Sequence, residues 1–432
     1  MEKPERIVII DCGGLHTQLI ARKVRECGVY SCILPNTAPL EEVLAGEPAG
    51  IILSGALPDG LESMTRTLPC PVMTIQDEDH ALLGVPLQNE AASVNDKQRM
   101  IASFLKDACG CRGEWNMEAY AEAEVQRIRE QAGSSGRVLL GLSGGVDSAV
   151  TAALIHRAIG DRLVCVFVNH GFMRKGECEQ VIDVFTRTFP AQLVHVDASD
   201  RFFRDLKGVT DPEAKRKIIG RDFVDVFREE AQKLGRLDHF AQGTIYPDVI
   251  ESGKANGSAV IKSHHNVGGL PGELGFTSLI EPLRMLFKDE VRKLGLSLGL
   301  PESLVRRQPF PGPGLAVRVV GDLTREKVAM ARESDAILRE EIAGAGLDRH
   351  ISQYFAVLTG ARSVGITGDK RTYDYTVAIR AVTSEDFMTA SVAQLPYELL
   401  GKVSGRIVTE VNGVNRVVYD VTAKPPAAIE WE

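Results

Sequence analysis

One ten-residue segment, 139–148, constrains the fold of this chain more than any other. It reads LLGLSGGVDS: an apolar run leads into Ser-Gly-Gly, and an apolar helical pattern starts at Ser148. This order predicts a buried strand, a tight loop and a helix. Gly144 and Gly145 can adopt positive φ and let the backbone approach a ligand closely. The first turn of the helix adds unpaired N–H groups and the positive end of the helix dipole, which together attract an anion.

The side chains of this segment favour a nucleotide phosphate as that anion. Ser143 and Ser148 supply hydroxyl donors, and Asp147 supplies the hard oxygen ligand that a Mg²⁺–phosphate complex needs. The loop is not a Walker A loop, because no Gly-Lys-Ser/Thr follows the glycines. It resembles the loop of the N-type ATP pyrophosphatases, which holds the β- and γ-phosphates and leaves the α-phosphorus open to attack. The alternative is a plain strand-to-helix turn with a serine cap, but six matched residues after a buried-type strand favour nucleotide binding.

Length, charge and cysteine usage exclude several other classes of protein. A chain of 432 residues is expected to form two or three domains, and its net charge of −8 argues against a broad nucleic-acid-binding surface. It has no apolar stretch of membrane-spanning length and no signal-peptide pattern, so we expect a cytoplasmic protein without membrane contact. All eight cysteines precede residue 179, which favours reduced thiols over a disulfide framework. Cys109 and Cys111 lack a second pair of ligands at zinc spacing.

The order of apolar runs predicts an α/β chain with three parts. Residues 1–112 alternate short strands (6–10, 50–53, 71–75) with helices (17–27, 97–108), as in a small parallel α/β sheet. A helix at 118–131 and a turn-rich joint at 132–136 lead into the next part.

Residues 113–307 repeat strand and helix, which predicts a doubly wound parallel sheet with its ligand at the carboxyl ends of the strands. The expected strands are 138–141, 163–168, 192–196 and 239–244, and the expected helices are 149–159, 176–188 and 211–234. Residues 250–278 carry six glycines and no periodicity, and we interpret them as a functional lid with a polar cluster at 261–266.

Residues 308–432 predict an α+β domain. The run Pro-Phe-Pro-Gly-Pro-Gly at 309–314 is interpreted as a rigid, turn-rich hinge, because proline fixes φ. A long helix is expected at 324–343, with β-rich runs at 354–358, 376–382 and 416–421. Such a sheet has a face to bury, which makes it a candidate dimer interface.

From about residue 139 to the end, the sequence closely resembles the GMP synthetase family, whose members aminate xanthosine 5′-monophosphate (XMP). The matching stretches are 142–148, 215–220 (KRKIIG), 241–252 (AQGTIYPDVIES), 262–266 (KSHHN), 287–292 (FKDEVR), 309–315 (PFPGPGL) and 424–432 (KPPAAIEWE). The resemblance implies that ATP adenylates the C2 oxygen of the xanthine ring and that ammonia then displaces AMP. It also implies a homodimer.

The resemblance assigns residues to the two substrates. It implies that the pyrophosphate end of ATP is held by the phosphate loop with Mg²⁺ on Asp147, and that lysines meet the developing charge. The implied catalytic residues are Asp147, Lys262, Lys288 and Asp289, and the implied ATP-binding residues are Leu142, Ser143, Gly144, Gly145, Val146, Asp147, Ser148, Val168 and Gly243. The implied XMP-binding residues are Arg216, Gln353, Lys424 and Glu430.

Each of these assignments has a plainer alternative. Arg216 lies on a charged helix and would by default face solvent, and Lys424 and Glu430 would by default belong to a frayed end. His264 and His265 are more simply polar loop residues than catalytic ones. The family usually has Asp where Asn169 stands, so one negative charge near the nucleotide is missing.

Residues 7–25 and 50–55 resemble the start of a class I glutamine amidotransferase, the domain that makes ammonia from glutamine. The catalytic positions depart from that pattern: Gln76 stands in the Cys position and Gln88 in the His position, and only Glu90 is left of the motif. Gly55-Ala56 stands where the family has a glycine pair at the oxyanion hole, and the region between the Cys and His motifs is largely deleted. Cys70 and His80 lie nearby but outside the motif positions. Because a carboxamide is neither a nucleophile nor a base, we predict that glutaminase activity is absent.

The sequence therefore predicts an ATP-dependent, ammonia-dependent ligase of the GMP synthetase type, with ammonia either free or supplied by a separate glutaminase subunit. Two alternatives stay open. One is another amidase or thiolase built on the same adenylating core, and the other is a regulatory pseudoenzyme that binds nucleotide.

Overall fold

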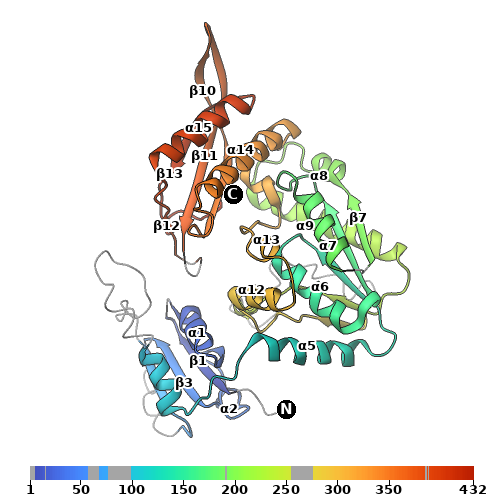
Figure 1. Cartoon of the computed structure of the whole chain (residues 1–432), viewed down its shortest axis with the longest axis vertical. Coiled ribbons are helices and arrows are strands. Elements are labelled where there is room, and N and C mark those ends of the chain that lie inside the picture. Colours follow the sequence, from blue (N-terminus) through green and yellow to red (C-terminus); the bar gives the residue numbers. More distant parts are fainter. Residues whose placement is uncertain are drawn as a thin grey trace. The chain divides into compact units, whose positions relative to one another are not determined.

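The structure is a computed structural model that describes residues 5–14, 16–56, 68–75, 99–189, 192–253, 276–384, 387 and 389–432. Contacts divide the chain into two compact units, residues 1–123 and 124–432 (Figure 1). The division falls inside helix α5 (Met117–Ala132), which confirms the helix expected at 118–131. Each unit is described by itself below.

The first unit is built on a four-stranded parallel sheet in the order β2-β1-β3-β4. Its elements are β1 (Arg6–Cys12), α1 (Thr17–Glu26), β2 (Tyr30–Pro35), α2 (Leu40–Leu44), β3 (Gly50–Gly55), β4 (Val72–Ile75) and the π-helical turn η2 (Phe104–Ala108). Strands β1 and β3 are almost entirely buried, because the sheet is covered on both faces. Within the described residues, the helix expected at 97–108 is α-helical over 99–103 and continues as η2 over 104–108.

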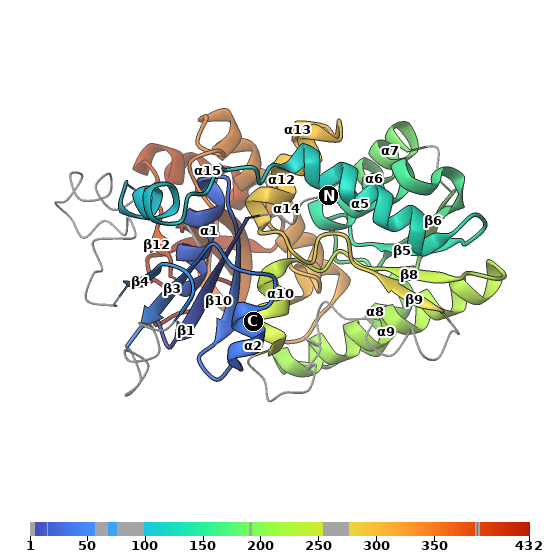
Figure 2. The ribbon, with the colours of Figure 1, turned by 90° about the horizontal axis from the view of Figure 1, so that it is seen from below.

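The second unit contains the predicted doubly wound sheet. Five parallel strands stand in the order β7-β6-β5-β8-β9, so the first strand of the unit is central. The elements are β5 (Val138–Leu142), α6 (Val146–Ile159), η3 (Gly160–Arg162), β6 (Leu163–Asn169), α7 (Glu177–Thr188), β7 (Gln192–Asp197), α8 (Ser199–Asp205), α9 (Pro212–Lys233), β8 (His239–Ala241), α10 (Tyr246–Gly253), β9 (Ser278–Ile280), α12 (Lys288–Ser297) and α13 (Glu302–Val305). Helices α6 and α7 cover one face, and α8 and α9 cover the other (Figure 2).

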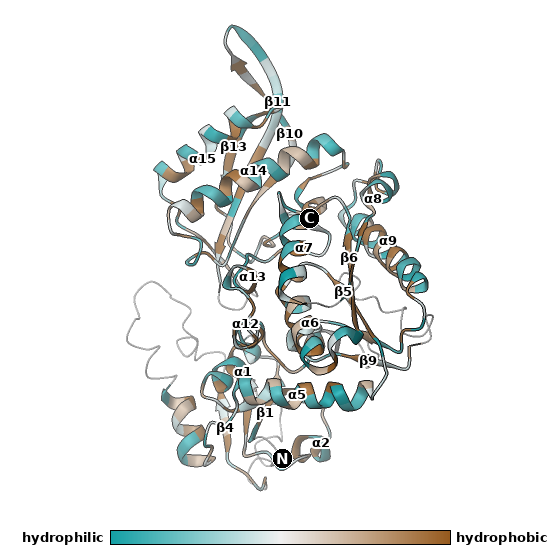
Figure 3. Ribbon diagram, turned by 45° about the vertical axis from the view of Figure 1, so that its right-hand side comes forward, coloured by the Kyte–Doolittle hydropathy of each residue, from teal (hydrophilic) through white to brown (hydrophobic). Residues whose placement is uncertain are grey.

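Hydropathy explains why this sheet is sandwiched. The central strands β5 and β6 are apolar along almost their whole length, whereas the outward sides of α5 and α7 are hydrophilic (Figure 3). Strands without a polar face must be buried on both sides, as in parallel sheets generally. From β5 the chain passes through β6 to β7 at one edge of the sheet, and it then crosses back to the other side of β5 to form β8 and β9. The loop after β5 therefore lies at the point where the winding reverses, which is where doubly wound sheets bind ligands.

The remainder of the second unit is a mixed sheet covered by two helices. Strands β10 (Gln353–Thr367), β11 (Lys370–Thr383) and β12 (Ser391–Val392) are antiparallel, and β13 (Val414–Asp420) runs parallel to β11. Before them lie η4 (Gly314–Arg318) and α14 (Arg325–Gly344), and α15 (Tyr397–Glu410) precedes β13. Thr324 caps α14 by accepting a hydrogen bond from the Lys327 amide (3.2 Å). The β10–β11 hairpin is longer than predicted and extends as an arm beyond the two helices (Figure 1).

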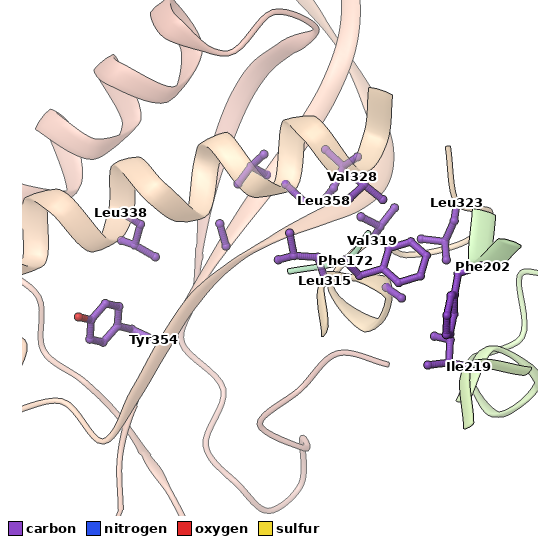
Figure 4. Close-up of a cluster of buried hydrophobic side chains, with 14 of the residues drawn as sticks. Phe172, Phe202, Ile219, Leu315, Val319, Leu323, Val328, Leu338, Tyr354 and Leu358 are labelled. Atoms are coloured by element: carbon purple, nitrogen blue, oxygen red, sulfur yellow. The ribbon is translucent and has the colours of Figure 1, made fainter. Parts of the chain in front are cut away.

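One hydrophobic core joins this mixed sheet to the doubly wound sheet. Phe172 and Phe202 from the parallel-sheet side pack in the same cluster as Leu315, Val319 and Val328 (Figure 4). The segment before η4 is held in place as well. The Leu315 amide donates to the Phe172 carbonyl (2.8 Å), and a Cβ added at Gly314 would lie 2.4 Å from that same oxygen. The expected domain boundaries at 112/113 and 307/308 stay predictions.

Candidate functional site

The loop between β5 and α6 has the form that the sequence predicts. Gly144 adopts a φ of +74°, in the left-handed region that favours glycine, and Gly145 is the extended N-cap residue of α6. A Cβ added at Gly144 would also lie 3.0 Å from Val181 Cγ2. Helix α6 begins at Val146 rather than at Ser148. Its unpaired N–H groups therefore start directly at the glycine pair.

The two serines of the loop fix each other. Ser148 Oγ donates to the Gly145 carbonyl (3.0 Å) and lies 3.3 Å from Ser143 Oγ. Ser143 Oγ in turn accepts from the Gly145 amide at 3.3 Å. Ser148 is buried and Ser143 is exposed, so the loop presents one hydroxyl to solvent and uses the other to hold its shape.

Asp147 and Lys288 are brought together from positions 141 residues apart. Lys288 Nζ donates to both carboxylate oxygens of Asp147, at 2.8 and 2.6 Å. Asp147 lies in the first turn of α6 and Lys288 is the first residue of α12, a helix that packs on α6. Both side chains are partly open to solvent, at 27% and 38% of their full exposure. A lysine and a carboxylate that can be reached beside a phosphate loop are suited to a metal–phosphate ligand.

Four further residues predicted for the ATP site line this corner through backbone and packing. Leu142, Val146 and Val168 are buried, and they contribute shape rather than polar groups. Gly243 follows β8, and a Cβ there would lie 3.1 Å from the Asp147 carbonyl carbon and 3.2 Å from the Ser148 amide nitrogen. A side chain at this position would press on the start of α6, so glycine suits this close passage best.

Two other predicted residues flank the site, and a third group lies outside the described residues. Asp289 lies in the first turn of α12, next to Lys288. Asn169, at the end of β6, accepts a hydrogen bond from the Gly171 amide (2.9 Å), so its side chain holds the turn that follows. Lys262, His264 and His265 fall in 254–275, which the structure does not describe.

Arg307 contacts the phosphate loop and was not predicted from the sequence. Its guanidinium donates to the Gly144 carbonyl and to Glu177, the first residue of α7. Burial lowers the pKa of Arg307 to about 9, which still leaves the group charged at neutral pH. Arg307 lies two residues before the proline-rich run, and the separation of 163 residues from Gly144 concealed the contact in the sequence.

Gln353 and Glu430, both predicted to contact XMP, meet in the structure. Gln353 Nε2 donates to Glu430 Oε1 (2.8 Å). Arg318 holds the same carboxylate with a two-pronged contact, through Nε to Oε2 (3.1 Å) and Nη2 to Oε1 (2.9 Å). Arg318 is fully buried, so the C-terminal segment that carries Glu430 is fixed rather than frayed.

The other two residues predicted for XMP are placed differently. Arg216 donates to the backbone carbonyl of Glu432, and so lies near the same C-terminal segment. Its neighbour Lys215 is fully buried, contacts the Glu432 carboxylate and donates to the Val319 carbonyl (2.8 Å). Lys424 instead donates to the Phe387 carbonyl (2.6 Å). Among the described contacts, none joins Lys424 to the other three predicted residues.

The strand ends of the first unit carry a different set of groups. Asp11 Oδ1 accepts from the Gly13 amide (3.0 Å) and from Thr17 Oγ1 (3.2 Å), and Thr17 Oγ1 also lies 3.0 Å from Ser54 Oγ. Gly55 ends β3 with a φ of +106°. The positions Gln76, His80, Gln88 and Glu90 lie in 76–98, outside the described residues.

All eight cysteines of the chain are described, and all are free thiols. Burial is the largest cause that raises the pKa of every one of them; the eight are Cys12, Cys27, Cys32, Cys70, Cys109, Cys111, Cys165 and Cys178. The pKa of Cys109 rises to about 12 and that of Cys111 to about 11. A raised pKa is the opposite of what activates a nucleophilic thiol.

Comparisons with known proteins match two parts of this chain to two families. Residues 340–431 match the family described as GMP synthase C terminal domain, and residues 119–218 match the family described as NAD synthase. In the part of the chain that the structure describes, no helix is long and apolar enough to cross a membrane.

Several full-length relatives carry one name. The "GMP synthase [glutamine-hydrolyzing]" of Acetivibrio thermocellus is 46% identical, and the alignment covers 99% of each chain. The proteins of the same name from Bacillus cereus and Clostridium botulinum are 46% and 44% identical, over 99% and 100% of each chain. The alignment with the Acetivibrio protein runs over 510 positions, so that relative carries residues that this chain of 432 lacks. Among solved structures, an NH3-dependent NAD synthetase from Campylobacter jejuni is similar at 17% identity and a TM-score of 0.35, covering 44% of this chain and 77% of that one.

Proposed function

The chain belongs to the GMP synthase family, and we propose that it converts XMP to GMP with ATP and Mg²⁺, using ammonia rather than glutamine as its nitrogen donor. The observation that carries this proposal is the pairing of Asp147 with Lys288 beside the Gly144–Gly145 loop at the winding reversal of the sheet. The loop, the first turn of α6 and Lys288 of α12 together offer N–H groups, a hydroxyl, a carboxylate and an ammonium to one end of a nucleoside triphosphate.

The reaction follows from charge placement. The C2 oxygen of xanthine is a poor leaving group; it attacks the α-phosphorus of ATP, the bond to the β-phosphate oxygen breaks, and pyrophosphate leaves with the electron pair. The loop amides, the dipole of α6 and Lys288 stabilise the charge that develops on the pyrophosphate. Ammonia then attacks C2, AMP leaves, and the nitrogen loses its extra proton to give the amino group of GMP.

The residues present fit a magnesium ion of the kind that phosphates bring with them. Mg²⁺ in such sites takes one or two carboxylates and completes its shell with phosphate oxygens and water. Asp147 supplies one accessible carboxylate, and among the described residues no group of three or more acidic, histidine or cysteine ligands exists that could hold a metal alone. Bound there, the ion would neutralise charge on the departing phosphates. Lys288 donates to both oxygens of the same carboxylate and so orients it.

For the second substrate, the proposal uses the C-terminal segment. Glu430 and Gln353 offer an acceptor and an amide to the ribose or base of XMP, and Arg216 offers a cation to its phosphate. Lys424 is a second candidate for the phosphate, although it contacts Phe387 in the structure. Lys262 would join the site from the undescribed segment 254–275.

Ammonia as the direct donor is supported by the thiols and by the sequence. Gln76 and Gln88 replace the expected nucleophile and base, and none of the eight cysteines has a lowered pKa. A glutaminase needs a thiolate with a base beside it. The named relatives carry "glutamine-hydrolyzing" in their names, so this chain would differ from them in its nitrogen source. A separate glutaminase subunit is then one way to supply ammonia.

The proposed activity is tested by measuring GMP formation from XMP, ATP and Mg²⁺, with ammonium chloride and glutamine as separate donors. We expect product with ammonium and none with glutamine. Product from glutamine that a cysteine-directed inhibitor abolishes would contradict the ammonia dependence. Absence of product with either donor would contradict the synthase proposal and favour a regulatory nucleotide-binding role.

We also propose a homodimer through the mixed sheet. The β10–β11 arm exposes Val364 (59%), Ile366 (77%) and Tyr373 (60%), and Val364 and Tyr373 are directly paired across the hairpin. Large apolar side chains gathered on one arm are typical of a subunit interface. Sedimentation should give twice the mass of one chain, and Ile366→Asp should shift that mass toward one chain.

A further inference from the structure

A line of buried charges of alternating sign connects the phosphate loop to Glu430. It consists of Arg307, Glu177, Arg174, Asp335, Arg318 and Glu430, and it is called here the buried ion-pair chain. Four of its members, Glu177, Arg174, Asp335 and Arg318, are each at most 4% exposed. Charges taken out of water interact strongly with one another, because little solvent screens them.

The first end of the chain touches the ATP site. Arg307 divides its guanidinium between the Gly144 carbonyl and the Glu177 carboxylate. Glu177 is itself shared, because it also accepts from the Arg174 amide (2.9 Å) and lies 3.8 Å from the Arg174 guanidinium. Arg174 further donates to the carbonyls of Gln308 (3.1 Å) and Pro309 (2.7 Å), the two residues that follow Arg307.

In the middle of the buried ion-pair chain, the contacts between opposite charges are longer than those at its ends. Asp335 lies between two arginines, 3.7 Å from Arg174 Nε and 3.8 Å from Arg318 Nη1. Arg174 Nε, Asp335 Oδ2 and Arg318 Nη1 are all buried and make no hydrogen bond to any described residue. Buried polar atoms that lack partners are costly. A small movement that closes either gap would therefore be favourable.

The second end of the chain touches the proposed XMP site. Both oxygens of Glu430 are held by Arg318, and one of them is shared with Gln353. A substrate hydroxyl or base N–H that bonds to Glu430 would take part of this carboxylate away from Arg318. Arg318 would then turn toward Asp335, where an acceptor is already waiting at 3.8 Å.

We propose that the buried ion-pair chain couples the two substrate sites, so that XMP bound at Glu430 strengthens ATP binding at the phosphate loop through Arg307. When Arg318 moves onto Asp335, Arg174 is released toward Glu177, and Glu177 loosens its hold on Arg307. The Arg307 charge is then more available to the loop that receives the phosphates. Arg307 is thus a positioning residue of the loop. This inference rests on the proposed function, because it takes Glu430 as a contact of XMP.

An exposed ion pair close to the buried ion-pair chain serves as a matched control. The same two segments that carry Arg174 and Asp335 are joined a second time by Lys175 and Glu333, at 2.6 Å. That second pair is exposed, at 57% and 43%, and it contacts neither substrate site among the described contacts. Exposed pairs are screened by solvent and transmit little. Likewise, Arg306 precedes Arg307 but pairs with Glu302 at the surface (2.8 Å).

The test measures the dissociation constant of α,β-methylene-ATP with Mg²⁺, on the full chain by calorimetry, with and without saturating XMP. This analogue resists cleavage at the bond that the reaction breaks. In the wild type, XMP should tighten the analogue by about fivefold or more, the lower end of typical coupling, and the analogue should tighten XMP by the same factor. In Asp335→Asn and Arg307→Lys that factor should fall toward one. In Glu333→Gln and Arg306→Lys it should stay at the wild-type value.

Three results would overturn the inference: no coupling in the wild type, full coupling in both chain variants, or equal loss in the two controls. If Asp335→Asn fails to fold, Arg307→Lys decides, because Arg307 lies at the edge of the core with 14% of its side chain exposed. If a residue has only a structural role, its variant should bind the analogue more weakly both with and without XMP, or melt at a lower temperature. The ratio of the two dissociation constants should then stay at the wild-type value. GMP formation with ammonium distinguishes the two proposals: a wild type that makes GMP without coupling contradicts this inference alone.

Discussion

The two parallel sheets of this protein each have a strand that ends in a glycine pair followed by a helix, yet they treat the nearby carboxylate differently. After β1, Asp11 turns back onto its own loop and is occupied by the Gly13 amide and the Thr17 hydroxyl. After β5, Asp147 lies inside the helix and faces Lys288 from another helix, with both side chains open to solvent. Two sequence patterns of similar composition thus give a turn whose carboxylate bonds within the turn in one unit, and a solvent-accessible carboxylate–lysine pair in the other.

The comparison teaches that glycines at a strand end allow a ligand site but do not make one. A site also needs charged groups that the loop itself leaves available, and a second element that brings the opposite charge. In the second unit, α12 provides that element. In the described part of the first unit, the polar groups at the ends of β1 and β3 are used within the turn itself.

The difference between the two units is tested most directly by neutralising Asp147 and Asp11 in separate variants. Asp147→Asn should reduce ammonia-dependent GMP formation by roughly 100-fold to 1000-fold, because it removes a charge aimed at the metal–phosphate group. Asp11→Asn should leave that rate within about twofold of wild type. Initial-rate assays of both variants check the prediction, and similar losses in the two would contradict it.

The reactivity of the cysteines in the first unit provides a second test of the difference between the two units. With pKa values of about 12 and 11, Cys109 and Cys111 should be alkylated by iodoacetamide at pH 7.5 roughly 100-fold to 1000-fold more slowly than glutathione, since the thiolate is the reacting form. Mass spectrometry of the labelled protein measures this. Rapid labelling of one thiol in the first unit would reveal an activated nucleophile and would weaken the case for ammonia dependence.

Acid sensitivity should reside in the second unit, because that unit contains the buried His170. Burial lowers the pKa of His170 to about 4, below its unfolded value of about 6.5. The unfolded chain therefore binds the extra proton first. The stability that neutral His170 provides is complete above pH 6.5 and is lost as the pH falls toward 4, by about 3 kcal/mol in total.

His170→Asn removes this titration while keeping an acceptor for the Phe172 amide, which bonds to His170 Nδ1 at 3.0 Å. Urea unfolding at pH 5 and pH 7 should show a smaller difference in free energy for the variant than for the wild type. Equal pH dependence in the two proteins would show that His170 is not the titrating group.

The smallest expected effect tests how closely β8 must pass α6. Gly243→Ala should reduce kcat/KM for ATP by about tenfold, because the new Cβ would press on the Asp147–Ser148 peptide at 3.1 to 3.2 Å. Gly401→Ala is the control. Gly401 lies in α15 with nothing within 4 Å of an added Cβ, so that change should leave activity unaltered and raise stability slightly. An unaffected Gly243→Ala enzyme would show that the close passage is unimportant for ATP.

Much of the fold follows from sequence periodicity. The strands and helices around 138–168 are apolar enough to be predicted with small errors, and the doubly wound order follows from their alternation. Strands β10 and β11 were predicted too short because their outer halves form the exposed arm, where Val364 and Ile366 alternate with polar residues. The strand β8 ends at Ala241, three residues early, because the chain turns at Gly243 to pass the start of α6.

Site residues that form a continuous motif could be predicted from the sequence. Site residues whose contacts are distant in the sequence could not. The loop 143–148 was visible in six consecutive residues. Lys288 and Glu430 came only from resemblance, since no spacing rule connects them to Asp147 or Gln353. Arg307, Arg318 and Asp335 were missed, because a buried ion pair looks like an ordinary surface charge in a sequence. The Arg318–Asp335 contact appears only when α14 packs beside the segment 309–318, and the Arg307 contacts appear only when the phosphate loop and α7 are in place.

The proline-rich segment 309–314 has a consequence for how fast the second unit can respond to its substrates. The sequence predicted a hinge there, yet Arg174 holds the carbonyls at its start and the Leu315 amide bonds to Phe172 at its end. A segment held by hydrogen bonds at both ends is not free to act as a hinge. We therefore expect no slow rotation of one sheet against the other during turnover. Substrate-driven changes in this unit would be shifts of side chains and loops, which take nanoseconds to microseconds rather than the microseconds to milliseconds of domain closure.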